Sequence, residues 1–394
     1  MSARKTLIAL SALGSLWLAP GAAHAGPVLK VGEESWLRIN YEVQLHGPWR
    51  DTGSGPDGTG DTTDVYFRRN RLTLIGRVTN AFGFVGSIQH QGDRRIQDVT
   101  VSQQPVRTFD VLDAFAMIDV HEAFNLRAGL TKDPLVREHN ENCFFPLSAD
   151  RSLFVYTPLP RLSRDFGVVA WGNLLQSRVQ YRVAAMKGND DGTEPRSSLR
   201  YTARAHVTLL EPEASLVYQG TYLGQKRVLT VGGGYQLEPD AVYGNVGART
   251  LARSYRAWSV DGFFEYPLPA GTVTASAAYL HADFDGAYQG GDPDPRSVGI
   301  TGERQGWYAK AGYLLPVNVW KGKVQVYARA ENWEFARLTG IVDQEIRWGA
   351  AGVNYFIEGQ SVRITLEYSR NDFVIESGAT RDFNTVNVML QMLF

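Results

Sequence analysis

Nine arginines lie in stretches where polar and apolar residues alternate: Arg69, Arg71, Arg77, Arg127, Arg178, Arg182, Arg204, Arg329 and Arg363. Successive side chains of a strand point to opposite faces, so this spacing predicts strands with one apolar and one cationic face. Guanidinium groups around a water-filled passage favour anions, because low-dielectric walls concentrate their field. The alternative is that they brace the wall by pairing with acids such as Glu265, Glu331 and Glu367.

The sequence carries no recognisable catalytic or metal-binding motif. None of the histidines after residue 25 lies in a nucleophile, zinc or carboxylate signature. We therefore expect no catalytic residue, no metal site and no cofactor. A triad assembled in space would escape this test, so a barrel-shaped hydrolase remains an alternative.

The elements that position the arginines are strands, and the clearest is the last stretch of the chain, Thr385–Phe394. Its alternate residues form one apolar face, made of Val386, Val388, Leu390, Met392 and Phe394. A wall strand that faces lipid ends naturally on an aromatic residue at the water boundary. The edge strand of a soluble sandwich is the alternative for this stretch alone.

The same alternation recurs from about residue 34 and predicts sixteen strands. Short links such as 267–271 alternate with long polar ones such as 283–303. An even strand count, with short links at one end and long loops at the other, is the pattern of transmembrane barrels. We interpret Glu211–Gln225 as an unusually long link at the short-link end, because a hidden strand there would break the parity. Gly47–Asp64 is predicted to be a flexible loop.

A closed barrel reconciles these charges with a lipid-facing wall. An open sheet would expose two edges, and in lipid every backbone group must be paired within the protein. Apolar residues such as Val324 and Val326 should point outward and Gln325 and Arg329 inward. A barrel of this size encloses a water-filled lumen. The predicted fold class is therefore all-β, a transmembrane antiparallel barrel of about sixteen strands.

Residues 1–25 have the pattern of a secretory signal peptide. Arg4 and Lys5 precede an apolar run from Leu7 to Leu18, and Ala23–Ala25 is a small-residue cleavage site. We expect cleavage there, export to a bacterial outer membrane, and a single barrel domain over residues 26–394. The only cysteine is Cys143, so no intramolecular disulfide can form. We expect no nucleic-acid partner.

The stretch from Lys132 to Asp165 is too long for a turn and too rich in proline for strands. Its apolar residues, which include Phe144 and Leu147, predict that it folds into the lumen and narrows the passage. Its arginines would then face Arg69, Arg71 and Arg127. Its charges are mixed in sign, which indicates a transverse field across a constriction. The candidate constriction residues are Lys132, Arg137, Glu138, Arg151, Arg161, Arg164 and Asp165.

The tryptophans fit an interfacial girdle better than a sugar-stacking surface. An aromatic surface for sugars must face the lumen, whereas Trp258 and Trp307 fall in the outward phase of their strands. We assign Trp36, Trp171, Trp348 and Tyr368 as well either to the girdle or to packing between strands.

Several segments together resemble phosphate-selective porins of the O and P type. They are Tyr66–Arg71, Arg127–Pro134, Glu138, Arg164–Gly167, Gly220–Gly224, Gly232–Gly234 and the terminal Phe394. The resemblance spans most of the chain after residue 25, and the order of the motifs is more specific than any one of them. It implies a sixteen-stranded trimeric outer-membrane porin with an inward-folded third loop. The clustered loop lysines of phosphate-specific members are not apparent here, so the solute is left open.

The sequence thus predicts a porin for passive diffusion of small hydrophilic solutes, with phosphate or other anions as candidate solutes and membrane lipid around it. Phe394, as the terminal aromatic, is the candidate signal for membrane assembly. A hydrolase and a structural or adhesin barrel are the alternatives. Convergence of a serine, a histidine and an acid on one wall would favour the hydrolase. A lumen blocked by side chains would favour the structural or adhesin barrel.

Overall fold

The computed structural model describes residues 26–90, 109–152, 164–188, 194–245, 247–283, 304–338, 341–376 and 381–394. The predicted signal peptide, Arg161 and most of the 283–303 loop lie outside this part of the chain. No helix in these ranges is long and apolar enough to cross a membrane.

The described residues form eighteen strands and one short helix, α1 (Arg137–Asn140). The first half of the chain supplies β1 (Val28–Lys30), β2 (Trp36–Ser54), β3 (Gly60–Thr63), β4 (Tyr66–Arg77), β5 (Phe82–His90), β6 (Phe109–His121), β7 (Phe124–Lys132), β8 (Arg164–Leu174) and β9 (Val179–Met186). The second half supplies β10 (Arg200–Thr208), β11 (Val228–Asn245), β12 (Thr250–Leu268), β13 (Gly271–Asp283), β14 (Arg304–Val319), β15 (Gly322–Leu338), β16 (Ile341–Glu358), β17 (Val362–Phe373) and β18 (Phe383–Leu393).

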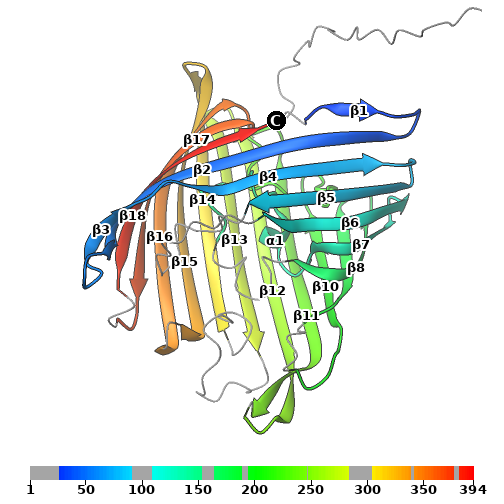
Figure 1. Cartoon of the computed structure of the whole chain (residues 1–394). Coiled ribbons are helices and arrows are strands. Elements are labelled where there is room, and N and C mark those ends of the chain that lie inside the picture. Colours follow the sequence, from blue (N-terminus) through cyan, green and yellow to red (C-terminus); the bar gives the residue numbers. More distant parts are fainter. Residues whose placement is uncertain are drawn as a thin grey trace, which may run out of the picture.

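These strands form one antiparallel sheet that closes on itself (Figure 1). β1 and β3 are short additions beside β2, and β2 with β4–β18 makes a wall of sixteen strands. β18 pairs with β2, where Leu390 lies opposite Leu45, so the wall has no free edge. The predicted barrel and its strand number are confirmed.

Alternation along each strand decides which side chains face outward. In β17, Leu366 and Tyr368 are 50% and 51% exposed, whereas Thr365 and Glu367 are 0% and 1% exposed. The last strand behaves in the same way, with Val388 and Met392 on its exposed face. The outer surface is therefore an apolar belt, and the inner face is largely polar.

The links between strands alternate between short and long, as predicted, but one predicted loop is partly formed by strands. Glu211–Gln225 contains no strand, which confirms its interpretation as a link. Gly47–Asp64 is not a flexible loop throughout, because β2 continues to Ser54 and β3 pairs with it. The indole N–H of Trp49 donates to Asp61 across this hairpin, with 3.0 Å between Nε1 and Oδ2. Cross-strand pairing of this kind extends the wall beyond what the glycine-rich composition predicts.

The inner face also carries an apolar cluster that alternation alone does not reveal. It joins Leu135 and Val136 of the third loop to inward residues of β11–β18, among them Tyr255, Leu280 and Trp333. This sector of the inner face gives the third loop an apolar surface against which its leucine and valine pack.

The tryptophans divide between the two faces. Trp258 and Trp307 are both 42% exposed, which confirms their outward phase. Trp348 is only 1% exposed and lies on the inner face of β16, so of the two predicted roles it has the packing role and is not part of the girdle. The Arg329 guanidinium lies 3.2 Å from the centre of its ring, and this cation–π contact stabilises an indole that faces the lumen.

Phe394 is expected to matter for assembly more than for the folded state. Its ring is 67% exposed, and its backbone pairs with Tyr41 of β2, with 2.7 and 2.9 Å between nitrogen and oxygen. Deletion of Phe394 removes these closing bonds and an interfacial aromatic, whose individual contribution to stability is modest. The amount of heat-modifiable barrel in outer-membrane fractions should fall. Wild-type amounts after deletion would contradict this expectation.

Candidate functional site

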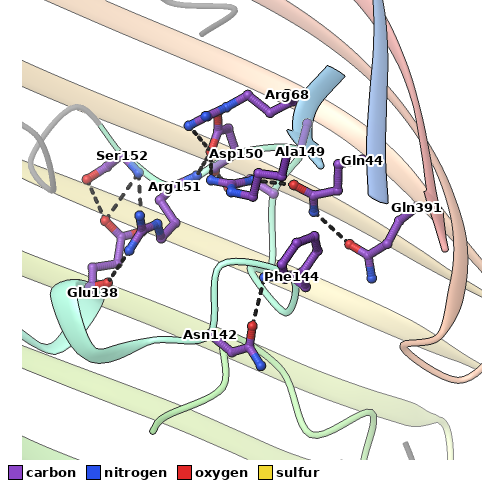
Figure 2. A network of polar contacts seen from close by, with 12 residues as sticks. Gln44, Arg68, Glu138, Asn142, Phe144, Ala149, Asp150, Arg151, Ser152 and Gln391 are labelled. Carbon is purple, nitrogen blue, oxygen red and sulfur yellow. Dashed lines mark hydrogen bonds and ion pairs between the residues drawn. The ribbon is translucent and has the colours of Figure 1, made fainter. Parts of the chain in front are cut away.

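A carboxylate of the third loop, Asp150, is the centre of a cluster of charged groups inside the barrel. The loop joins β7 to β8, and its described residues 133–152 lie inside the barrel, as predicted. Asp150 binds two guanidinium groups, with 2.5 Å from Oδ2 to Nε of Arg68 and 2.9 Å from Oδ1 to Nη2 of Arg69 (Figure 2). All three side chains are at most 2% exposed. A buried carboxylate with two cations and several hydrogen bonds is a specific anchor.

Two consecutive arginines reach the same carboxylate because the strand is irregular there. Gln44 of β2 lies opposite Arg69, but the next residue, Leu45, lies opposite Phe67, so Arg68 is an extra residue. Such a bulge turns a side chain that would face lipid back toward the interior. Phe67 remains outward at 42% exposure, while Arg68 is 1% exposed.

Further contacts hold the loop to the opposite part of the wall. Lys310 of β14 pairs with Glu138, which also accepts from the Ser152 hydroxyl at 2.7 Å. Arg329 of β15 donates to the Ser148 hydroxyl at 2.9 Å and to the Asp150 carbonyl at 2.6 Å. The loop is therefore attached on both sides of the barrel and forms a bar across it.

Arg69 meets a loop acid, Asp150, where the sequence predicted loop arginines. Among the described loop arginines, Arg137 points toward β12, and Arg151 donates to the carbonyl of Glu138 at 3.2 Å. Because removing the counter-charge of a buried guanidinium is costly, the Asp150 carboxylate holds the loop to the wall at this point.

Three of the candidate constriction residues belong to strands. Lys132 ends β7 and donates to the Glu141 carbonyl at 2.7 Å. Arg164 begins β8 and pairs with Asp113 of β6 at 2.9 Å. Asp165 accepts from the backbone of Gly188 at 2.7 Å. They frame the base of the third loop and do not lie at its tip.

A second segment enters the lumen from the opposite end of the barrel, and the sequence did not predict this. Residues 211–225, which link β10 to β11, meet the third loop through backbone hydrogen bonds. Tyr218 exchanges bonds with Asn140 and Asn142, at 3.1 and 2.9 Å, and the N–H of Gly220 donates to Phe145 at 2.9 Å. Inward segments from the two ends of the barrel are thus joined inside it.

The junction is reinforced by a buried ion pair. Both terminal nitrogens of Arg137 bind Glu213, at 2.7 and 2.8 Å. Burial raises the pKa of Glu213, but the Arg137 guanidinium and the hydroxyl donors Thr230 and Tyr222 outweigh it and lower this pKa to about 2. The pair is therefore ionised across the physiological range. Arg137 and Arg182 also lie over the ring of Tyr218, 4.6 and 4.4 Å from its centre.

The predicted lumenal arginines divide into two groups. In the first group each has a carboxylate partner: Arg69 with Asp150, Arg71 with Glu42 at 4.0 Å, Arg77 with Asp119, Arg204 with Asp261 at 2.5 Å, and Arg329 with Glu331 at 3.5 Å. The acids predicted to brace the wall supply only one of these partners, Glu331.

In the second group, no ion pair with a described residue is formed. Arg127 lies over the ring of Phe115, at 4.8 Å. Arg182 donates to the Gln180 amide at 2.6 Å, and Arg363 to the Pro146 carbonyl at 2.8 Å. Their positive charges therefore have no directly bonded carboxylate among the described residues, unlike those of the first group.

The ninth arginine, Arg178, is not in the lumen. It lies in the turn before β9, is exposed, and donates to the carbonyls of Leu209 and Leu210 at 3.2 and 3.1 Å. It caps the edge of the wall.

The described residues give little support to catalysis. The hydroxyl bonded to lumenal His206 belongs to Tyr218, at 2.8 Å, and is not that of a serine. No group of three His, Cys, Asp or Glu that could hold a metal occurs among the residues in these ranges.

Comparisons with solved structures support the fold. The outer membrane channel DcaP of Acinetobacter baumannii has a TM-score of 0.58 at 15% identity, over 94% of this chain and 100% of that chain. OmpF of Salmonella typhi in complex with daunomycin has a TM-score of 0.61 at 12% identity, over 93% and 100%. An anion-selective porin from Comamonas acidovorans has a TM-score of 0.54 at 11% identity, over 92% of this chain and 100% of that chain. At these identities the likeness shows the barrel fold alone. No protein-family model and no curated protein matches the sequence.

Two features of the site could have been found in the sequence. Arg68 and Arg69 are adjacent in a lipid-facing strand, so regular alternation would point one of them into lipid. Because an arginine side chain in lipid is strongly unfavourable, the pair indicates a bulge. The 211–225 segment keeps Leu216, Val217, Tyr218 and Tyr222. The apolar content that predicts an inward third loop equally predicts that this segment folds into the lumen.

The first prediction from this site concerns the junction. Glu213→Gln removes the carboxylate that binds both terminal nitrogens of buried Arg137 and leaves Glu141, 3.4 Å from Nε, as its ion-pair partner among the described residues. Breaking a buried pair costs about 3–5 kcal/mol when no other counter-charge remains, so a smaller cost is expected here. The two inward segments should separate more readily, and single-channel conductance in planar bilayers should rise. Glu211→Gln is the matched control, because Glu211 pairs with Arg227 at the exposed edge of the barrel. Equal conductance of the two variants would show that the junction does not shape the passage.

The second prediction concerns pH. Burial raises the pKa of Asp133 from its ordinary value to about 6, opposed by the Leu135 N–H, Arg200 and Thr202 and assisted by Asp165. Between about pH 4 and 6 the folded state then binds more protons than the unfolded state, so stability falls as pH rises through this window. The loss is at most about 3 kcal/mol. Thermal unfolding in detergent should show this slope in the wild type and a smaller one in Asp133→Asn. Identical slopes would refute it.

Proposed function

We propose that this protein is an outer-membrane porin, a channel for passive diffusion of small hydrophilic solutes. The observation that carries the proposal is the closed sixteen-stranded wall with an apolar outer belt and a charged inner face. Such a wall is stable in lipid because each backbone group is paired and charges face away from the hydrocarbon. The fold shared with OmpF and DcaP supports the same class.

We further propose that the passage prefers anions. The support is the second group of arginines, Arg127, Arg182 and Arg363, whose charges have no carboxylate partner among the described residues. A cationic lumen with low-dielectric walls raises the local concentration of anions. Phosphate is one candidate solute by the sequence resemblance, and chloride serves as the general probe.

The chain enters this location through a signal peptide over residues 1–25, which we propose is cleaved on export. We propose a homotrimer, supported by the uneven height of the wall. β7, β9 and β10 have 9, 8 and 9 residues, whereas β12 has 19. Tilted strands of eight or nine residues rise only about 20 Å, less than the apolar band of about 25 Å. Neighbouring copies would cover this low sector.

One observation favours a structural barrel as the second candidate. The described residues of the third loop are almost all buried, as expected of a bar that fills much of the lumen. Wild-type protein in planar bilayers separates the two candidates. Discrete conductance steps support the porin, and their absence supports a structural role.

The test of anion preference uses arginines that have no ion pair. Replacing Arg127, Arg182 and Arg363 together by glutamine should move the zero-current potential in a salt gradient toward cation selectivity. Replacing Arg69, Arg71 and Arg127 by alanine should move it in the same direction. In the first triple, each glutamine retains a hydrogen-bonding side chain, so the loss of charge is the main change.

Arg178→Gln is the matched control, since this arginine lies at the edge of the wall. It should leave the zero-current potential at the wild-type value. An unchanged potential in the first triple variant would show that those arginines only brace the lumen, and the anion proposal would fail.

A further inference from the structure

The inner face of β16, β17 and β18 carries a cluster of polar side chains that lack partners. Trp348, Glu367, Asn371, Thr385 and Asn387 are each 1% exposed, and we call these five residues the polar patch. The indole N–H, one carboxylate oxygen, the threonine hydroxyl and all four amide atoms of the two asparagines form no hydrogen bond with the part of the chain that the structure describes. Buried polar atoms in folded proteins are rarely left unpaired, so this concentration requires an explanation.

The register of the sheet shows that the patch is contiguous. Trp348 lies opposite Asn371 between β16 and β17, and Glu367 lies opposite Asn387 between β17 and β18. Thr385 lies opposite Ser369, between these two rows. Three strands and the five residues from 367 to 371, which are four residue steps, define an area of about 10 by 13 Å. This area matches one or two sugar rings.

The donors and acceptors of the patch fit an uncharged polyhydroxylated solute. Amides and a threonine hydroxyl offer both roles at short spacing, and sugar hydroxyls also donate and accept. Net charge is unfavourable in either sign. The Glu367 carboxylate disfavours an anion, and the Arg329 guanidinium over Trp348 disfavours a cation. Arg329 also occupies one face of the indole, so Trp348 contributes through its N–H edge.

The tip of the third loop lies on this patch. Ala149 packs against Trp348 and Ala350, and its N–H donates to the Tyr327 hydroxyl at 3.0 Å and to Glu367 at 3.2 Å. The loop tip pairs with only one of the two Glu367 oxygens and with neither asparagine. In this position the unpaired atoms destabilise the folded state, because each has lost its hydrogen bonds to water. A solute that pairs with them while the tip lifts would recover part of that cost.

We propose that the polar patch is a binding subsite for an uncharged mono- or disaccharide, reached at the seam between β16–β18 and the tip of the third loop. This proposal rests on the proposed channel function, because the sugar would reach the subsite through the channel. The sugar's hydroxyls bind the asparagine amides and the Thr385 hydroxyl. The subsite adds recognition of neutral solutes to a passage whose arginines attract anions.

The first experiment is titration of sucrose into the purified full chain in detergent, followed by calorimetry, which does not depend on conduction. Saturable binding is expected. Asn371→Leu with Asn387→Leu should weaken it about tenfold or more, since each variant removes one or more hydrogen bonds. Thr208→Val is the matched control, because its hydroxyl pairs with Thr230 on the far wall at 3.2 Å. This control should bind sucrose as the wild type does.

The second experiment records the ion current of single channels with sucrose or sodium gluconate present. Sucrose should reduce the wild-type current with the calorimetric affinity, and the double variant should lose this effect but keep its response to gluconate. Heat-modifiable mobility verifies folding, and Thr385→Val, which removes one hydroxyl at similar volume, replaces the double variant if that fails to fold.

No sucrose binding to the wild type, or equal binding to the patch variants, would overturn the proposal. Sucrose binding to a protein that conducts no ions would retain the subsite and overturn the channel function. The two proposals therefore fail by different results.

Discussion

The structure depends on one constraint, the pairing of every backbone polar group in a wall that faces lipid. The bonds between β18 and β2 meet it by closing the sheet, and the closing pair extends to the last residue, Phe394, opposite Tyr41. Closure then dictates the rest, because alternation sends half of the side chains into an enclosed space. Charges that lipid excludes collect there, and the lumen must accommodate them.

The charges inside are accommodated partly by acids of the wall, such as Glu42 and Asp261, and partly by segments that fold in from both ends. Asp150 of the third loop neutralises Arg68 and Arg69, and Glu213 of the 211–225 link neutralises Arg137. The two segments bond to each other, so their positions are coupled. The width of the passage is consequently a property of this junction as much as of the wall.

Much of the fold could be predicted because alternation is a local signal. The outward phase of Trp258, the long link at Glu211–Gln225 and the inward third loop all follow from residue spacing and apolar content. The ion-pair and hydrogen-bond partners across the lumen could not be predicted, since the three-dimensional path of the loops determines them. Arg68 turns inward through a one-residue bulge, and the inward indole of Trp348 is covered by the Arg329 guanidinium from the neighbouring strand. Neither the bulge nor this partner has a period in the sequence.

The central claim is that the closed wall surrounds an ion-conducting, anion-preferring passage. It is tested most directly by the zero-current potential of the purified wild-type protein in a planar bilayer separating two potassium chloride concentrations. The account predicts discrete conductance steps and a potential of the sign set by chloride permeation. A bilayer without steps would contradict a conducting passage, and a potential of the sign set by potassium would contradict the role given to the lumenal arginines.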